Sequence, residues 1–253
     1  MTENTKGKQD YLVLARKYRP KTFEDVIGQD ALVKTLKNAI ESDRLHHAYV
    51  LQGIRGTGKT TTARLLAKVL NCENGPATTW AEDDAQCKAI ETGTHVDVLE
   101  FDAASHTGVD DIRTLFEGVN YAPVQGHYKV YIIDEVHMLS KQAFNALLKT
   151  LEEPPEKVKF IFATTEVNKI PVTVLSRCQR FDLKRISAED LCGLYTSILQ
   201  KEDVAFDEAA VMQIAKAADG SARDGLSLLD QAIALSVGGQ VTLDVVNGML
   251  GMA

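Results

Sequence analysis

The pattern of apolar and polar positions divides the chain into two parts. Between residues 11 and 185, short apolar runs alternate with helical patterns. Four of the runs have the length and the β-branched or aromatic content of buried strands, and they cover residues 48–52, 96–101, 129–133 and 158–164. Residues 59–70 and 140–153 instead place their apolar side chains on one helical stripe. Strands that alternate with helices predict an α/β domain whose parallel sheet is covered by helices on both faces.

The pattern changes near residue 185, where the strand signals end. Four helices are predicted beyond it, because residues that cap helix N-termini precede apolar stripes and glycines separate them. The capping residues are Ser187, Asp207, Ser221 and Thr242, and the glycines are Gly220, Gly238 and Gly239. We therefore expect a small all-α domain over residues 186–253, after an α/β domain over residues 11–185. Residues 1–10 are polar and are predicted to form a disordered tail.

The acidic composition limits what the chain could bind alone. Its formal net charge is −7, whereas proteins that hold DNA by themselves usually carry a basic excess. Any contact with DNA is therefore expected to be local or shared with other subunits. The first ten residues lack the apolar core of a secretory signal, and no apolar run approaches the roughly 18 residues of a membrane span. Four scattered cysteines indicate reduced thiols, so the expected location is the cytoplasm, with no membrane partner.

Residues 53–60, which read GIRGTGKT, match the phosphate-loop pattern G-x-x-x-x-G-K-[ST] in full. Glycines let the backbone curl so that its N–H groups point at phosphate oxygens, and the following helix adds the positive end of its dipole. Lys59 is expected to reach the β- and γ-phosphates, and the hydroxyl of Thr60 to bind Mg²⁺. The predicted nucleotide-binding residues are Gly53, Ile54, Arg55, Gly56, Thr57, Gly58, Lys59, Thr60 and Thr61. The alternative is a glycine-rich turn without a ligand, which the strand before and the helix after the loop disfavour.

Two carboxylates, Asp134 and Glu135, follow the predicted strand at 129–133. The carboxyl ends of parallel strands form the edge of an open sheet where ligands bind. Asp134 is suited to bind Mg²⁺ directly or to orient one of its ligands. Glu135 is then placed to polarise the attacking water. The alternative is a solvated turn, in which aspartate is common. Residues 134–137 (DEVH) also match the DExH box of helicases, which keeps a helicase hypothesis open.

Further stretches fit one pattern together. They are Ala15–Pro20 (ARKYRP), Phe23, Val26–Gln29 (VIGQ), His46–Tyr49 (HHAY), Asp134–Leu139 (DEVHML), Asn145–Pro155 (NALLKTLEEPP), Ala163–Thr165 (ATT), Ser176–Cys178 (SRC) and Gly220–Asp224 (GSARD). These stretches resemble the gamma/tau clamp-loader ATPases of bacterial DNA polymerase III, which are AAA+ proteins. The resemblance runs from Tyr11 to Leu250 and implies a AAA+ sheet domain followed by a helical lid.

The resemblance also implies roles that spacing alone does not assign. Thr165 would read the γ-phosphate, and Arg177 would be an arginine finger donated in trans to the ATP of a neighbouring subunit. Arg223 would touch the nucleotide of its own subunit. The segment around Arg19, Val26 and Ile27 would hold the adenine and the ribose. A planar, permanently charged guanidinium suits phosphate, although a single arginine is more often simply solvated.

The sequence departs from the family pattern in two places. The family holds zinc with four cysteines, but here only Cys72 and Cys87 stand at the outer positions, with Ala81 and Asp84 at the inner ones. Two thiolates fall short of four ligands, so zinc is not expected, although Glu82, Asp83 or Asp84 could complete a weaker site. The second departure concerns the loop that faces DNA in the family, which is basic there and carries His106 and Gly108 here. Lys149 could still contact primed DNA.

These observations predict an ATPase that uses Mg-ATP as the motor subunit of the DNA polymerase III clamp loader, within a holoenzyme that is a transferase. Its expected partners are other clamp-loader subunits, a sliding clamp and primed DNA. The rival hypotheses are a AAA+ helicase or branch-migration motor and a clamp-loader scaffold without hydrolysis. Gamma/tau proteins continue into a collar domain that assembles the ring, and nothing after Leu250 could supply it. The chain alone is therefore expected to be a monomer, although the full-length protein would be a hetero-oligomer.

Overall fold

A computed structural model describes residues 12–105, 109–236 and 238–252, so the predicted tail over residues 1–10 lies outside the described residues. The chain divides into two compact units. One unit runs from Pro20 to Ile186, and the other combines the residues up to Arg19 with those from Ser187 onward. Each unit is described separately below.

The first unit is built on a five-stranded parallel sheet in the order β2-β3-β4-β1-β5. The strands are β1 (Ala48–Gln52), β2 (Val98–Asp102), β3 (Lys129–Asp134), β4 (Val158–Thr164) and β5 (Gln179–Asp182). Strand β4 is buried along its whole length, as expected for a strand with neighbours on both sides and helices on both faces. The predicted parallel sheet is thus confirmed, although β2 begins two residues later than the pattern at 96–101 indicated.

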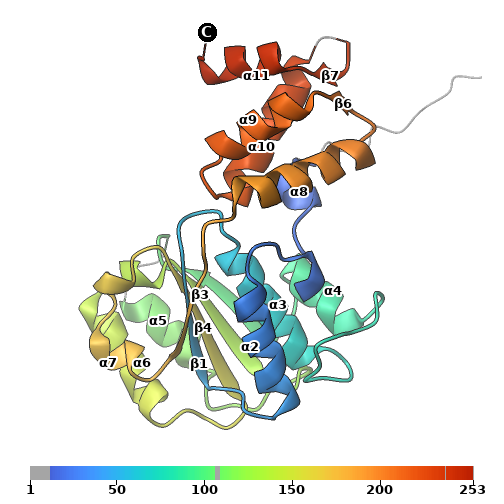
Figure 1. Ribbon diagram of the computed structural model, residues 1–253. Helices are drawn as coiled ribbons and strands as arrows, with labels where there is room; N and C mark the ends of the chain where they lie inside the picture. The colour runs from blue at the N-terminus through green and yellow to red at the C-terminus, as the bar shows by residue number, and fades with distance from the viewer. Residues whose placement is uncertain (1–11, 106–108, 237, 253) are drawn as a thin grey trace, which may run out of the picture. The chain divides into compact units, whose positions relative to one another are not determined.

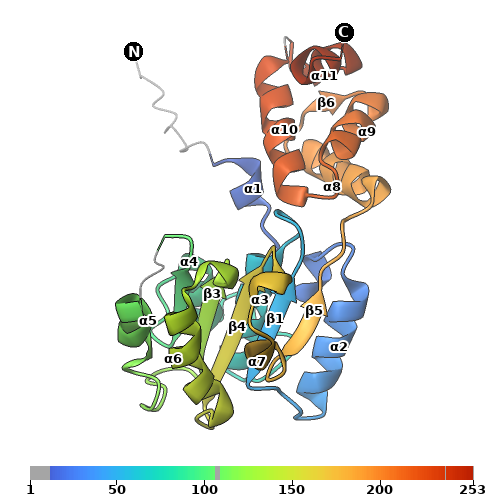
Figure 2. The same cartoon turned by 90° about the vertical axis from the view of Figure 1, so that its left-hand side faces the viewer.

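Helices cover both faces of this sheet (Figure 1, Figure 2). Their bounds are α2 (Asp30–Glu41), α3 (Lys59–Asn71), α4 (Ala85–Thr92), α5 (Val109–Phe116), α6 (Lys141–Glu152) and α7 (Val172–Leu175), with short 3₁₀ turns η1 (Phe23–Asp25), η2 (Val136–Met138) and η3 (Val167–Lys169). The sheet has one core on each face. Successive residues of a strand belong to different cores, because their side chains point to opposite faces. Tyr131 and Ile133 of β3 pack with the α5–α7 face, and Val130 and Ile132 pack with the α2–α3 face.

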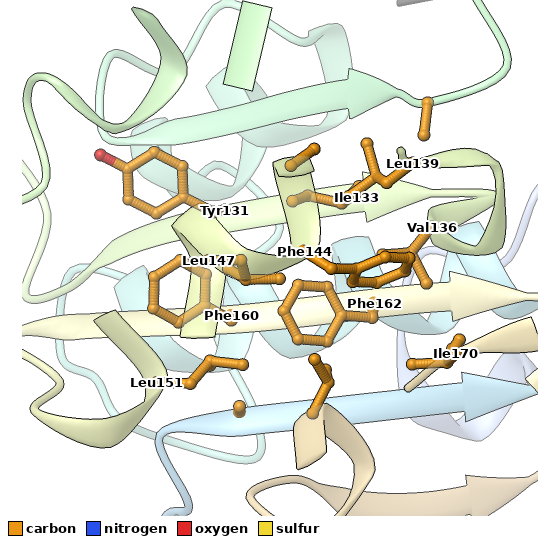
Figure 3. Close-up of a cluster of buried hydrophobic side chains, with 14 of the residues drawn as sticks. Tyr131, Ile133, Val136, Leu139, Phe144, Leu147, Leu151, Phe160, Phe162 and Ile170 are labelled. Carbon is orange, nitrogen blue, oxygen red and sulfur yellow. The ribbon is translucent and has the colours of Figure 1, made fainter. Parts of the chain in front are cut away.

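The core under α6 is rich in aromatic rings (Figure 3). Tyr131 of β3 and Phe160 of β4 stack with ring centroids 5.4 Å apart, and Phe160 stacks in turn on Phe162 at 6.1 Å. Phe144, Leu147 and Leu151 of α6 are buried against them, which is the stripe that the 3.6-residue period predicts. This packing fixes α6 and the ends of β3 and β4, where the candidate site lies.

The second unit contains α1 (Leu14–Lys17), α8 (Ala188–Lys201), α9 (Glu208–Ala217), α10 (Ala222–Leu235) and α11 (Leu243–Leu250). Three of the four predicted caps form hydrogen bonds, since the hydroxyls of Ser187, Ser221 and Thr242 each accept a backbone N–H of the first turn. Asp207 stands at the start of α9 without such a bond, and its carboxylate instead accepts from Gln240 and from the N–H of Leu243.

Two features of this unit correct the sequence-based description. It is not purely helical, because β6 (Ala205–Phe206) pairs in parallel with β7 (Gln240–Val241), and two-residue strands are too short to leave a pattern. Residues 12–19 also pack with it, although they were predicted in the α/β domain. The N–H of Leu14 donates to Asp230 over 2.9 Å, and Lys17 pairs with Glu202 over 2.6 Å. Among the described residues, no helix has the length and apolar character that crossing a bilayer requires.

Candidate nucleotide-binding site

The phosphate loop connects β1 to α3, at the carboxyl edge of the sheet. Gly56 and Gly58 have φ values of +78° and +96°, which L side chains rarely adopt. Gly53 is needed for a different reason, since a Cβ there would lie 2.8 Å from Thr57 Oγ1 and 2.9 Å from the Leu183 carbonyl oxygen. The loop thus has the backbone that its glycines predict, with α3 beginning at Lys59 immediately after it.

Lys59 is folded onto the loop that it would share with a nucleotide. Its Nζ donates to the carbonyl oxygens of Gly53 over 2.9 Å and Ile54 over 2.8 Å. The residue is buried, and burial lowers the pKa of its ammonium group, while Glu135 and Asp134 act in the opposite direction. An ammonium group that is already desolvated and surrounded by loop carbonyls requires little reorganisation to meet phosphate oxygens.

Two side chains whose oxygen atoms are suited to bind a cation meet beside this lysine. The hydroxyl of Thr60, in the first turn of α3, donates to Asp134 Oδ2 over 2.6 Å, and Asp134 is the last residue of β3. The two residues are 74 positions apart in the sequence. A hydroxyl and a carboxylate are ligands that Mg²⁺ accepts, together with phosphate oxygens and water. The residues therefore fit the predicted Mg²⁺ site.

Glu135 lies next to Thr165, which the family resemblance assigned to the γ-phosphate. Glu135 Oε2 accepts from the N–H of Thr165 over 3.3 Å and from its hydroxyl over 3.1 Å. Glu135 itself has a φ of +46°, in the left-handed region that costs energy for a residue other than glycine. Such a backbone at the end of a buried strand is typical of a functional position. The structure thus brings Thr60, Asp134, Glu135 and Thr165 to one edge of the sheet.

Sequence reasoning gave no role to His137, which lies in the same place. Its Nδ1 is 2.9 Å from Thr164 Oγ1 and 3.4 Å from Glu135 Oε2, and its Nε2 is 3.4 Å from Glu166 Oε1. The signals were the DExH pattern and the family stretch Asp134–Leu139, which indicate a histidine near the carboxylates but not what it contacts.

Arg177 follows α7 and is held by residues near the ends of α6 and α7. Its guanidinium donates to the Thr173 carbonyl over 2.7 Å and pairs with Glu152 over 2.8 Å. The side chain is about one-third exposed, at 34%. None of the described hydrogen bonds of Arg177 reaches the phosphate loop of its own chain, which is compatible with the predicted action in trans.

The other residues that the resemblance singled out belong to both units. Val26 and Ile27 lie between η1 and α2 of the sheet unit, and Val26 packs against the α2–α3 core. Arg19 and Arg223 belong to the helical unit, where Arg223 is in the first turn of α10. Lys149 is exposed in the last turn of α6, whereas His106 and Gly108 lie outside the described residues. The roles of these residues stay predictions.

The segment between α3 and α4 does not fit a zinc ion. Asp84 caps α4, because its carboxylate accepts the N–H of Cys87 over 2.8 Å and that of Glu73 over 2.9 Å. One oxygen therefore caps α4, and the other fastens this cap to the segment that follows α3. Burial and, less strongly, Asp84 raise the pKa of the Cys87 thiol, and burial also raises that of Cys72, whereas zinc binds thiolates. No group of three potential metal-ligating side chains occurs within the described part of the chain.

We expect the double variant A81C/D84C to acquire tightly held zinc, since it would carry four thiols, at positions 72, 81, 84 and 87. Elemental analysis after dialysis against a chelator would measure about one zinc per chain in this variant and less in A81C alone. The unmodified chain should hold no zinc or substoichiometric zinc. One zinc retained per unmodified chain would contradict the assignment of Asp84 as a cap rather than a ligand.

Comparisons with known proteins identify two matching family models and close relatives in sequence. The family model described as DNA polymerase III, delta subunit, matches residues 28–187, and the one described as DNA polymerase III clamp loader subunit, ATPase lid domain, matches residues 192–238. The chain is 54% identical to DNA polymerase III subunit tau of Escherichia coli, over 95% of this chain and 37% of that protein. It is 49% identical to subunit gamma of Buchnera aphidicola from Acyrthosiphon pisum, over 96% of this chain and 67% of that protein.

The fold has relatives outside this group. The RuvB Holliday junction branch migration motor of Thermotoga maritima matches 92% of this chain and 72% of that chain, with a TM-score of 0.69 and 21% identity. At this identity the match shows the AAA+ fold alone. The chain spans about a third of the length of the first curated relatives, including 35% of subunit tau/gamma of Haemophilus influenzae, to which it is 54% identical over 96% of its own length. With family models matched over both units and close gamma and tau relatives, the chain belongs to the gamma/tau family of DNA polymerase III clamp-loader subunits.

Proposed function

We propose that the chain is an ATP-hydrolysing motor subunit of the DNA polymerase III clamp loader, which places a sliding clamp on primed DNA. One observation carries the proposal. In a chain 54% identical to tau subunits, a complete phosphate loop, the Thr60–Asp134 pair and the Glu135–Thr165 pair lie together at one sheet edge. Its partners would be other clamp-loader subunits, the clamp and DNA, with Lys149 as a local DNA contact. Its setting would be the cytoplasm and its holoenzyme a transferase.

Each of the site residues has its own role in binding or hydrolysing ATP. Backbone N–H groups of residues 53–61 and Lys59 hold the phosphates, while Arg19, Val26 and Ile27 hold the nucleoside. Thr60 and Asp134 would hold Mg²⁺, which would supply positive charge to neutralise the phosphates. Glu135 polarises the attacking water, and Thr165 senses the γ-phosphate. Arg223 contacts the nucleotide of its own chain, and Arg177 reaches that of a neighbour, where its fixed charge stabilises the transition state.

Turnover measurements separate this proposal from its rivals. A clamp-loader motor should hydrolyse ATP faster when sliding clamp, primed DNA and the partner subunits are all present than when any one is omitted. Stimulation by DNA alone, independent of the clamp, would favour a helicase or branch-migration motor. ATP binding without turnover under every condition would favour a scaffold subunit.

Glu135→Gln should keep ATP affinity near that of the wild type and reduce kcat by about 10²–10⁴-fold, because the amide cannot accept the proton of water. Single-turnover kinetics and binding of a fluorescent ATP analogue would measure the two effects separately. Loss of binding with unchanged turnover per bound ATP would mean that Glu135 holds the nucleotide instead.

A further inference from the structure

His137 lies in a buried position that its place in a surface turn does not explain. It belongs to η2, directly after Glu135 and Val136, yet its side chain is only 5% exposed. Each ring nitrogen lies near side-chain oxygen atoms. Nδ1 faces Thr164 Oγ1 at 2.9 Å and Glu135 Oε2 at 3.4 Å, while Nε2 faces Glu166 Oε1 at 3.4 Å. The imidazole therefore lies between two carboxylates, one of which would act on water.

The ring also joins the ends of two neighbouring strands. His137 follows β3, and Thr164 is the last residue of β4, fully buried. Thr164 Oγ1 accepts the N–H of Glu166 over 3.0 Å, and its carbonyl oxygen accepts the N–H of Gly53 over 3.3 Å. The residue that His137 contacts is thus bonded to the first residue of the phosphate loop and lies next to Thr165. His137 therefore contacts the segment that bonds to the phosphate loop and carries Thr165.

Glu135 needs such support, because little else in the described structure holds its carboxylate. Its Oε2 accepts two hydrogen bonds, both from Thr165 and both longer than 3.0 Å. Its backbone is in the left-handed region, and its side chain is 29% exposed. A carboxylate that polarises water must be held to within about 0.5 Å of its productive position, and groups that lock its rotamer supply this precision.

We propose that His137 is a positioning residue for ATP hydrolysis, which holds the Glu135 carboxylate against Thr165 in the orientation that polarises water. The inference rests on the proposed function, since it concerns the same reaction. It assigns His137 an effect on the rate of hydrolysis and none on nucleotide binding. Its rivals are a purely structural role, in which the ring only packs β3 against β4, and a restraining role, in which it holds Glu135 away from water.

The first test replaces the ring. His137→Ala should lower kcat for ATP by about 10–100-fold, as expected when a reacting group is misplaced by a fraction of an ångström to 1 Å. Affinity for a fluorescent ATP analogue should stay within about twofold. His137→Asn should restore most of the rate, because its amide nitrogen occupies roughly the position of Nδ1. His46→Asn is a matched control, since its Nδ1 contacts only Ala48 at the opposite end of β1 among the bonds described; its kcat should equal that of the wild type.

The second test measures whether His137 acts through Glu135. In a Glu135→Gln background, His137→Ala should change kcat by less than about twofold, because residues that act as a unit are not additive. An equal loss in both backgrounds would show a structural role, and a higher kcat in His137→Ala would show a restraining one; either overturns the inference. Thermal melts check folding, and His137→Phe, which keeps the ring volume without the nitrogens, replaces the alanine variant if that does not fold.

The outcomes for the two proposals are distinct. If wild type hydrolyses ATP and His137→Ala does so at the same rate, this inference is wrong and the proposed function stands. If the wild type binds ATP and does not hydrolyse it with partner subunits, clamp and DNA present, the proposed function is wrong, and the positioning role is wrong with it.

Discussion

Lys59→Ala should weaken ATP binding by at least about 100-fold. Charge-assisted hydrogen bonds contribute about 1.5–3 kcal/mol each, and an ammonium group between two phosphates makes at least two of them, while 1.4 kcal/mol is a tenfold change in affinity. The ammonium group is pre-positioned for this task, since it already lies on the carbonyl oxygens of Gly53 and Ile54. Titration with a fluorescent ATP analogue, with and without Mg²⁺, would measure the loss.

The variant needs a folding control, because Lys59 is buried at the start of α3. Removing it leaves the Gly53 carbonyl without its described partner, whereas the Ile54 carbonyl still accepts from the Thr57 hydroxyl. The loss at Gly53 could lower the melting temperature without involving a nucleotide. Lys88→Ala serves as the matched change, since Lys88 is exposed on α4. ATP should raise the melting temperature of wild type and Lys88→Ala and leave that of Lys59→Ala unchanged. Equal ATP affinity in the folded Lys59→Ala variant would contradict the phosphate-loop assignment.

The parts of the fold that could be predicted from sequence are those in which the buried positions follow the periodicity of a strand or a helix. Strands β1, β3 and β4 are buried on both faces and read as continuous apolar runs. Strand β5 reads Gln-Arg-Phe-Asp and buries only Phe181, because it is an edge strand, so no periodicity marked it. The N-terminal segment was assigned to the wrong unit for a related reason. It is attached by the burial of Leu14 and by polar contacts such as that of the Leu14 N–H with Asp230, and neither leaves a local pattern.

The candidate site divides in the same way. The phosphate loop and Asp134 could be placed together because parallel strands bring their carboxyl ends to one edge. The choice of Thr165 needed the family resemblance, since a threonine after a strand has no distinctive spacing, and its contact with Glu135 was not predicted. The position of His137 followed from neither argument. Its burial depends on how η2 folds back over the end of β4, where Thr164 and Glu166 supply its partners, and no local pattern specifies that turn.

Arg177→Ala should leave ATP binding by each chain intact and reduce hydrolysis by about 10³–10⁵-fold in an assembly, the effect of an arginine finger supplied in trans. The guanidinium lies at the surface, anchored by Glu152 and the Thr173 carbonyl, so one edge is held while the rest can face a neighbour. Arg180→Ala is the matched control, because Arg180 is also exposed and pairs with Asp182 over 2.8 Å on β5. It should keep the wild-type rate.

A mixing experiment tests the trans assignment directly. Lys59→Ala chains lack a nucleotide site but carry Arg177, whereas Arg177→Ala chains carry an intact site without the finger. Each variant alone should be nearly inactive, and the mixture, at concentrations where chains meet, should recover part of the wild-type rate, because fingers of the first variant complete the sites of the second. Complementation of this kind needs a shared active site. If the mixture stays inactive while wild type hydrolyses ATP under the same conditions, or if a strictly monomeric Arg177→Ala preparation shows the full loss relative to monomeric wild type, Arg177 acts within its own chain.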